Sequence, residues 1–295
     1  MRRADKKVST MPNDTAILLI HSPDQPGLVH DVTGFIFAHG GNIVDLQQHI
    51  DPEENAFFMR VAWTLEKFTL DTEEIASRFA IIARRHQMRW KLRFASNRHR
   101  LALLVSKESH CLYDLLSRHE SGELPVDIPL IISNHDLLRS ASERFGIPFH
   151  HFPVTKDNKA EVEQQQLALL REHRIDTVVL ARYMQIISAG FVEAYPDNII
   201  NIHHSFLPAF VGAKPYHQAY ERGVKIIGAT SHYVTADLDQ GPIIHQDITR
   251  VTHEDSVRDL VRIGKDLEKN VLAGALWSHV TNKVLVYRNK TIVFA

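Results

Sequence analysis

Apolar and polar positions in the first third of the chain follow the periods of short strands and amphipathic helices. An apolar run at 15–22 predicts a strand, and the Asp-Gln-Pro-Gly turn after it leads into a helix over about 28–39. A second helix is expected after Asp71, which fits the N-cap of a capping box with Glu74 three residues later. The remaining strands are expected at 42–50, 56–65 and 88–95. This βαββαβ order predicts a ferredoxin-like α/β domain over residues 13–95.

Beyond the polar stretch 96–100, which we interpret as a linker, short apolar runs alternate with helical patterns. Strands are expected at 101–106, 128–134, 149–153, 177–181 and 198–203, and helices at 110–119, 136–145, 159–173 and 188–194. This alternation indicates βαβ units and a mostly parallel, Rossmann-like sheet. Two late strands, 226–234 and 243–251, are expected to be antiparallel, and a helix at 255–279 and a hairpin at 284–294 follow. The second domain is therefore predicted to span 101–295.

Composition narrows the class of protein. The 295 residues suffice for two ordinary domains, and a net charge of −1 gives no basic field that would draw the chain to nucleic acid or anionic membranes. Its apolar runs are far shorter than the ~20 residues of a membrane helix. The single cysteine, Cys111, cannot form an internal disulfide, which suits a reducing compartment. We therefore expect a cytoplasmic protein with no nucleic-acid or membrane partner.

The 19 histidines raise the question of a metal site. No His-Glu-x-x-His motif occurs, and one thiol cannot build a zinc cluster. The adjacent pair His203-His204 is expected to point to opposite sides of an extended chain. We predict that the protein uses no metal and no cofactor.

The segment from Asn198 to Pro208 carries the strongest chemical signal. Because side chains alternate along a strand, Asn201 and His203 share one face, near the carboxyl end where open α/β sheets bind ligands. An amide beside an imidazole supplies a carbonyl-polarising donor next to a proton donor. On spacing alone, two satisfied polar residues at a strand end explain the pattern equally well.

The turn Leu238-Asp239-Gln240-Gly241-Pro242 joins the two late strands. Asp239 is expected to approach His203 and stabilise its imidazolium, or to orient or deprotonate a water. On local sequence alone an ordinary turn carboxylate is favoured, because Asp is a preferred turn residue.

A phosphate-binding loop is expected to be absent from the start of the second domain. The segment 105–110 between its first strand and helix has no glycine, and Glu108 there would repel a phosphate.

Taken together, these motifs resemble the formyl-transferase fold that is shared by glycinamide ribonucleotide formyltransferase and its relatives. The run Asn-Ile-His-His-Ser-Phe-Leu-Pro, followed by Leu-Asp-Gln-Gly-Pro, carries the resemblance over roughly residues 100–280. It implies that Asn201, His203 and Asp239 form the family's catalytic trio. It also implies that a folate substrate contacts two segments, made of Met184, Gln185, Ile186 and Ile187 and of Ala236, Asp237 and Leu238.

The ribonucleotide enzymes keep a Gly-Ser-Asn turn where this chain has Ser106 to Cys111. That departure, with Lys214-Pro215-Tyr216-His217 and the Phe-Leu-Pro-Ala-Phe run that ends at Phe210, resembles the formyltetrahydrofolate deformylase family. The family resemblance implies a hydrolase that acts on a linear amide C–N bond and releases formate and tetrahydrofolate from 10-formyltetrahydrofolate. A formyltransferase to an amine acceptor, and a regulatory folate-binding protein without turnover, are the alternatives.

The first domain resembles an ACT domain, a small-molecule sensor that deformylases of this family carry. The resemblance implies regulation by an amino-acid effector and self-association into a homo-oligomer. The effector residues it implies are Asp24, Gly27, Leu28, Asn42 and Ile43. The simpler interpretation is a purely structural dimerisation module.

Overall fold

The computed structural model describes residues 14–209 and 215–295, and the chain separates into two compact units. Unit 1 contains the chain up to Asn97 together with residues 281–285 and 294–295, and unit 2 contains residues 98–280 and 286–293. The sequence placed all residues from 101 to 295 in the second domain, whereas the structure places residues 281–285 and 294–295 in unit 1. Phe210 and Lys214, which contributed to the resemblance, lie outside the described residues. In the part of the chain that the structure describes, none of the helices is both long and apolar enough to cross a membrane.

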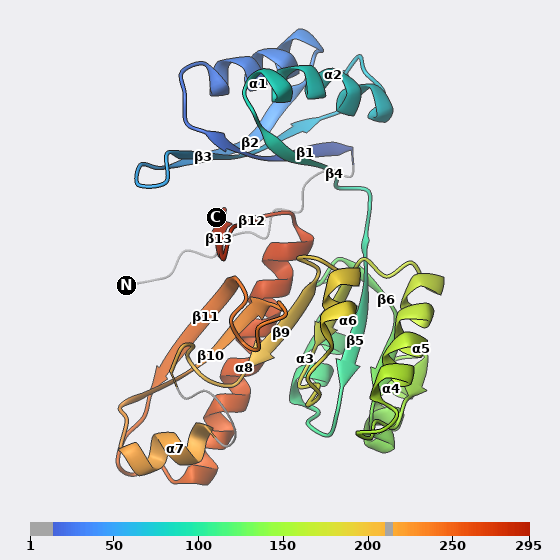
Figure 1. The fold of residues 1–295 in the computed structure, drawn as a ribbon, viewed down its shortest axis with the longest axis vertical. Coiled ribbons are helices and arrows are strands. Elements are labelled where there is room, and N and C mark those ends of the chain that lie inside the picture. The colour runs from blue at the N-terminus through green and yellow to red at the C-terminus, as the bar shows by residue number, and fades with distance from the viewer. Residues whose placement is uncertain (1–13, 210–214) are drawn as a thin grey trace. The chain divides into compact units, whose positions relative to one another are not determined.

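Unit 1 is a four-stranded antiparallel sheet with two helices on one face (Figure 1). The sheet order is β2-β3-β1-β4. Its elements are β1 (Thr15–Pro23), α1 (Leu28–Ala38), β2 (Asn42–Asp51), β3 (Ala56–Thr64), α2 (Thr72–Arg85) and β4 (Arg89–Phe94). The predicted βαββαβ fold is confirmed. The capping box is also present, since the Asp71 side chain accepts from the Glu74 backbone N–H and the Glu74 side chain accepts from that of Asp71.

The C-terminal segments join unit 1 through specific hydrogen bonds. Arg60 of β3 is 1% exposed, pairs with Asp45, and donates from Nε to the carbonyl oxygen of Asn282 at 2.8 Å. Gln47 of β2 exchanges two hydrogen bonds with the backbone of Ala295, each of 2.8 Å. Because these contacts join residues far apart in the sequence, a local sequence pattern could not assign the C-terminal segments to unit 1.

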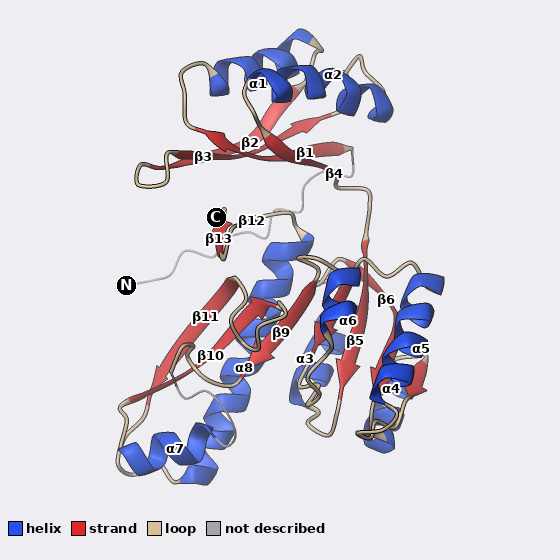
Figure 2. Cartoon of the chain, in the orientation of Figure 1, coloured by secondary structure: helices blue, strands red, loops and turns tan. Residues whose placement is uncertain are grey.

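Unit 2 is built on a seven-stranded sheet with the order β11-β10-β9-β8-β5-β6-β7 (Figure 2). Strands β5 to β9 are parallel, and β10 and β11 add an antiparallel edge next to β9. The predicted mostly parallel sheet with an antiparallel end is confirmed. The strands are β5 (His99–Val105), β6 (Val126–Ser133), β7 (Phe149–His151), β8 (Thr177–Leu180), β9 (Ile199–His203), β10 (Ile226–Tyr233) and β11 (Ile243–Arg250). A two-stranded β12-β13 ribbon (Val284–Tyr287, Lys290–Val293) ends the chain.

The helices of unit 2 pack against this sheet and each other. They are α3 (His110–Glu120), α4 (Arg139–Arg144), α5 (Lys159–Glu172), α6 (Ala189–Ala194), α7 (Pro215–Arg222) and α8 (Val257–Val280). The predicted helix at 136–145 is divided, because residues 136–138 form a 3₁₀ turn before α4. Helix α7 was not predicted. The 24-residue α8 packs along β9, β10 and β11 and against α3.

Candidate active site

Asn201 and His203 lie on β9, in the middle of the sheet, between parallel β8 and antiparallel β10. They stand two residues apart on the strand and therefore on the same face. Across the β9–β10 ladder, Asn201 is opposite His232 and His203 is opposite Thr230. The apolar neighbours Ile200 and Ile202 are buried and supply the packing, so the two polar side chains are free to serve a site.

Asp239 is brought to His203 by the loop between β10 and β11. The distance from His203 Nδ1 to Asp239 Oδ2 is 3.4 Å, and the carboxylate is 15% exposed. Asp239 has a φ of 55°, and Gly241 lies so close to β10 that an added Cβ would stand 1.8 Å from the carbonyl oxygen of Tyr233. Glycine is therefore required for the loop to fold back tightly onto β10.

The charge of Asp239 is stabilised by its surroundings. The contact with His203, followed by that with His232, holds the pKa of Asp239 well below its usual range, against a smaller opposing effect of burial. The carboxylate is consequently ionised through the neutral and mildly acidic range.

His232 is a fourth member of the site that the sequence analysis missed. It is 1% exposed, and its Nε2 lies 3.3 Å from Asn201 Nδ2 and 3.7 Å from Asp239 Oδ1. Its Nδ1 lies 2.9 Å from the carbonyl oxygen of Tyr233, which only accepts, so Nδ1 carries the proton. Its Nε2 faces both the Asn201 amide and the Asp239 carboxylate, so His232 holds these two side chains in place. The register of the β10–β11 pairing shifts between Ser231 and His232, next to the site.

One ring nitrogen of His203 remains available for chemistry. Its Nε2 is buried and has no hydrogen-bond partner among the described residues. Buried polar atoms are ordinarily paired, so an unpaired one in a candidate site marks a place for a ligand. The ring is held in place by His204, whose centroid lies 5.3 Å away at an interplanar angle of 28°. The expectation that these two side chains point to opposite sides was wrong, because β9 ends at His203 and strand alternation ends with it.

The two predicted folate-binding segments follow the strands on either side of β9. Met184, Gln185, Ile186 and Ile187 lie in the loop after β8, and Ala236, Asp237 and Leu238 lie in the loop after β10. Met184, Ile186 and Leu238 are 58%, 61% and 57% exposed. The backbone N–H of Met184 is held by the hydroxyl of Ser106 at 3.0 Å, and that hydroxyl donates to Asn134 Oδ1 at 2.6 Å. Both loops therefore present apolar side chains to solvent, and the backbone of the loop after β8 is anchored by Ser106.

The predicted effector residues of unit 1 do not form one cluster within a single chain. Gly27, at φ 93°, is the N-cap of α1, whereas Asn42 and Ile43 begin β2 after the other end of that helix. Leu28 is 2% exposed and packs in the core with Val32 and Ile36, so only its backbone is available to a ligand. Asp24 is anchored through its backbone N–H to the carbonyl oxygen of Asn55 at 3.0 Å.

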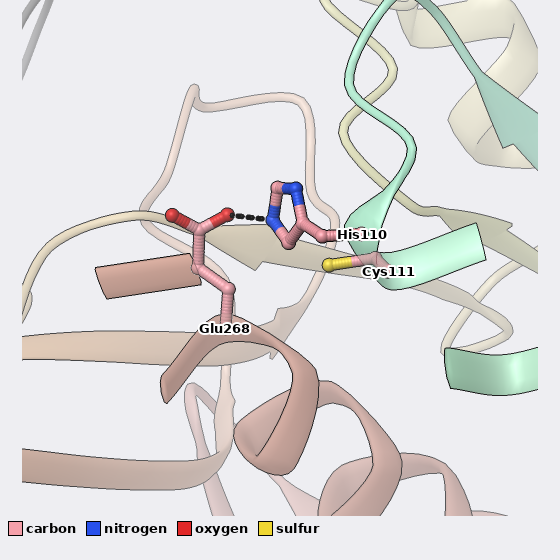
Figure 3. Close-up of side chains that lie close together, drawn as sticks. All are labelled: His110, Cys111 and Glu268. Atoms are coloured by element: carbon pink, nitrogen blue, oxygen red, sulfur yellow. Dashed lines mark hydrogen bonds and ion pairs between the residues drawn. The ribbon is translucent and has the colours of Figure 1, made fainter. Parts of the chain in front are cut away.

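A second polar cluster, which the sequence analysis also missed, is centred on Glu268 of α8, a residue 1% exposed. Figure 3 shows its carboxylate directed at His110, the first residue of α3, with Cys111 beside it; Oε2 lies 2.8 Å from His110 Nε2. The other oxygen accepts from the Tyr216 hydroxyl at 2.8 Å, and Arg182 Nε stands 3.3 Å from Oε2. A signal was present in the sequence: Glu268 lies within the apolar stripe of α8, among Leu267, Val271 and Leu272.

Three atoms of this cluster have a spacing that suits a metal ion. One ligand atom from each of His110, Cys111 and Glu268 lies within 4.8 Å of the others. Burial and the nearby Glu268 raise the pKa of the Cys111 thiol well above its usual range, so it holds its proton. A cation would also have to displace Arg182 from the Glu268 carboxylate. Because the Glu268 carboxylate is already engaged by His110, Tyr216 and Arg182, we assign no metal here.

The fold and the trio define a class of protein, the formyl transferases. The formyl transferase family model matches residues 99–276, and the ACT domain model matches residues 16–84. A formyltetrahydrofolate deformylase from Synechocystis sp. is 54% identical over 97% of this chain and 100% of its own length. The crystal structure of a formyltetrahydrofolate deformylase from Pseudomonas syringae pv. tomato is 47% identical, with a TM-score of 0.93 over 95% of this chain and 94% of that one. The chain belongs to the formyltetrahydrofolate deformylase family.

The wider class includes enzymes with a different acceptor. Glycinamide ribonucleotide transformylase 1 from Symbiobacterium toebii is 29% identical, with a TM-score of 0.64, and covers 67% of this chain and 95% of its own. Because the fold is shared, the fold alone cannot set the acceptor, which must be determined by side chains around the common site.

Proposed function

We propose that this protein hydrolyses 10-formyltetrahydrofolate to formate and tetrahydrofolate, using Asn201, His203 and Asp239 without a metal or cofactor. The observation that carries the proposal is the juxtaposition of an ionised Asp239 with His203, whose Nε2 has no partner among the described residues. Family membership at 54% identity over nearly the whole chain supports the reaction, and the geometry supports the assignment of roles.

Asn201 stabilises the oxyanion in this mechanism. Its amide nitrogen lies 3.3 Å from His232 Nε2, which fixes the position of the side chain, and an amide N–H is directed at the formyl oxygen. As water attacks, that oxygen gains negative charge, and a fixed donor of this kind contributes about 3–4 kcal/mol to transition-state stability.

His203 and Asp239 divide the proton transfers. Asp239 orients the attacking water and accepts its proton, and it holds the His203 ring in position through the 3.4 Å contact. His203 presents Nε2 to the folate nitrogen that leaves, and protonates it. The carbon–nitrogen bond breaks, formate is released with a proton to solvent, and tetrahydrofolate retains the transferred proton. The two residues are coupled, so their titration belongs to the pair.

The apolar loops after β8 and β10 are proposed to hold the pterin. Met184, Ile186 and Leu238 expose large side chains in the loops that follow the two strands flanking β9, which suits a flat aromatic ring. The hydrogen bond from the Met184 N–H to Ser106 keeps the loop after β8 in position before substrate arrives.

The decisive assay supplies purified protein with 10-formyltetrahydrofolate and no amine. We expect equimolar formate and tetrahydrofolate. Turnover only in the presence of an amine would show a transferase instead, and folate binding without turnover under either condition would show a regulatory binding protein.

Unit 1 is proposed to regulate this reaction as a homo-oligomer in the cytoplasm. Gly27 opens the N-terminus of α1, where backbone N–H groups and the helix dipole favour a ligand carboxylate. Since Asn42 lies beyond the other end of α1, it would complete the pocket from a neighbouring subunit. Methionine and glycine are the effectors to titrate first, by calorimetry and kinetics. A monomeric protein that binds neither would contradict this part of the proposal.

A further inference from the structure

Three basic residues lie at the carboxyl ends of β5, β6 and β7, outside the trio. Val105, the last residue of β5, is in register with Ser133 of β6, which in turn pairs with His151 of β7. Lys107 and His135 each stand two residues beyond a paired position, in the loops that follow β5 and β6. Because these strands are parallel to each other and to β9, all three residues lie at the end of the sheet that carries the trio. We call Lys107, His135 and His151 the basic rim.

The members of the basic rim lie close enough to repel one another. Burial, followed by the charges of Lys107 and His151, lowers the pKa of His135. Among residues 14–209 and 215–295, no carboxylate forms an ion pair with Lys107, and the adjacent Glu108 pairs instead with Lys265 at 2.7 Å. Holding like charges together without a counterion is unfavourable, and a bound anion would remove this cost.

The acidic neighbour of the basic rim is balanced by a further cation. Asp136 accepts from Arg139 Nε at 2.8 Å, and its Oδ1 lies 3.8 Å from His151 Nδ1. The hydrogen bond from Arg139 is the main cause that lowers the pKa of Asp136, so the carboxylate is ionised and paired. The charge of Lys107 is therefore left in excess, and protonation of either histidine adds to it.

The basic rim adjoins the loop that is proposed to hold the pterin. The Ser106 hydroxyl, next to Lys107, holds the Met184 N–H at 3.0 Å and donates to Asn134 Oδ1 at 2.6 Å. Asn134 directly precedes His135. The sheet order β9-β8-β5-β6-β7 then places the basic rim beyond the Met184 loop as seen from β9. A ligand that extends from the trio past this loop reaches the basic rim next.

A folate carries its anions on the part that extends away from the formyl group. The nitrogen that bears the formyl group belongs to a p-aminobenzoyl unit, whose far end is joined to glutamate. In polyglutamylated folates more glutamates follow through γ-amide bonds, and each keeps a free α-carboxylate. The hollow beyond the end of β9 on the other side of the trio is lined by apolar side chains such as Phe206, Ile226 and Ile248. Carboxylates are therefore better stabilised at the basic rim than on that side.

We propose that the basic rim binds the α-carboxylates of the glutamyl tail of the substrate, so that the protein prefers polyglutamylated 10-formyltetrahydrofolate to the monoglutamate. This inference rests on the folate substrate of the proposed function. Strand β7 lies three strands from β8, roughly 14 Å at the usual strand spacing. An extended α-linked residue spans ~3.6 Å, and a γ-linked one is longer because its backbone has two more carbons. A tail of about three or four glutamyl residues is therefore long enough to cross the basic rim.

The test compares the mono- and pentaglutamate forms of 10-formyltetrahydrofolate. Initial rates of formate release give kcat and KM for each form, at low and at high ionic strength. The pentaglutamate should have a KM about three- to tenfold lower, as a few exposed charge pairs provide, with a similar kcat. The advantage should shrink at high ionic strength, because salt screens exposed charges. Equal KM values at low ionic strength would overturn the proposal.

Substitutions locate the preference on the protein. Lys107→Gln and His135→Asn should each lower the ratio of the monoglutamate KM to the pentaglutamate KM, and the double variant should bring it close to one. The matched control is Lys225→Gln, because Lys225 is an exposed lysine just before β10, on the other side of β9. It should keep the wild-type ratio. A ratio that is unchanged in the folded double variant, or reduced as much in the control, would show that the basic rim is not the site.

A binding measurement separates this proposal from the hydrolysis. Calorimetric titration with tetrahydrofolate mono- and pentaglutamate needs no turnover, and the pentaglutamate should bind more tightly to wild type than to the double variant. Tighter pentaglutamate binding without formate release would contradict the hydrolysis alone, whereas formate release with equal affinities would overturn the tail site alone. Inorganic phosphate that inhibits as strongly as free γ-linked triglutamate would show a general anion site and overturn the assignment to the tail.

Discussion

Two polar clusters lie side by side in unit 2, and they differ in how completely their carboxylates are paired and enclosed. In the trio, His203 Nε2 has no partner among the described residues, and Asp239 is 15% exposed. In the Glu268 cluster, the carboxylate is 1% exposed and contacts three side chains. Burial alone therefore does not distinguish a reactive site from a structural one. Unpaired atoms alone do not either, because His110 Nδ1 and Arg182 Nε of the Glu268 cluster are also buried without a hydrogen-bond partner among the described residues. The carboxylates differ: that of Glu268 is satisfied by three side chains and has little to gain from a substrate, whereas that of Asp239 is partly exposed.

The largest effect on turnover is expected from a substitution of Asp239. Asp239→Asn keeps the shape of the side chain but cannot accept a proton from water, so we expect turnover to fall by about 10²–10⁴-fold. Folate binding should stay within a few-fold. Steady-state kinetics and calorimetric titration measure the two effects, with the exposed Asp247→Asn as the control. Near-normal turnover in Asp239→Asn would remove this carboxylate from the mechanism.

Removing either of the other two members should separate chemistry from folding. His203→Ala and Asn201→Ala are each expected to reduce kcat by roughly 10²-fold. Their melting temperatures should change little, because Ile200 and Ile202 retain the packing of β9. A variant that melts earlier yet keeps full specific activity would show that its side chain is structural.

The Glu268 cluster should respond in the opposite way, in stability more than in rate. Glu268→Gln places an amide N–H₂ against the donors of His110 and Arg182, and we expect the free energy of unfolding to fall by about 3 kcal/mol. The kcat of the folded protein should change by less than tenfold. Urea unfolding is the measurement, and Glu193→Gln on the exposed face of α6 should stay within about 0.5 kcal/mol of wild type. A stable variant with no activity would reverse the assignment of the two clusters.

His204 contacts both clusters, and its titration should make the free energy of unfolding depend on pH, because burial, followed by the charge of Arg182, lowers the pKa of its ring. Its folded-state pKa of about 4 lies below the unfolded value of 6.5, so between these values the unfolded chain binds a proton that the folded protein does not. Stability should therefore be intact above pH 6.5 and fall as the pH is lowered towards 4, by at most roughly 3 kcal/mol. His204→Asn accepts from Arg182 without titrating and should flatten this part of the profile, whereas the exposed His253→Asn should not. Parallel unfolding profiles for wild type and His204→Asn would contradict the assignment.

The smallest effect is expected from metal removal. The proposed steps use an amide, an imidazole and a carboxylate, so treatment with a chelator should leave kcat within error of the untreated protein. Loss of activity that is restored by one added metal would show that an ion serves one of the two clusters, and the Cys111 side of the Glu268 cluster would be examined first.

The sequence by itself determined the elements and much of their order. Strand and helix periods, the capping box at Asp71 and the alternation that places Asn201 beside His203 are local properties, because each depends on residues within one or two turns or on a single strand. The motif at Asp239 indicated which residue would join them, through a family resemblance rather than through any local physical rule. Where alternation was extended one residue beyond the end of β9, to His204, it failed.

Only the tertiary structure decided which polar side chains meet. His232 became visible once the β9–β10 register placed it opposite Asn201. Glu268 and His110 are 158 residues apart in the sequence, and their contact depends on how α8 packs against α3. The addition of residues 281–285 to unit 1 depends on Arg60 reaching the carbonyl groups of Thr281 and Asn282. Such contacts arise from the packing of whole elements. A local sequence period carries no information about which distant side chain will become the hydrogen-bond partner of a given residue.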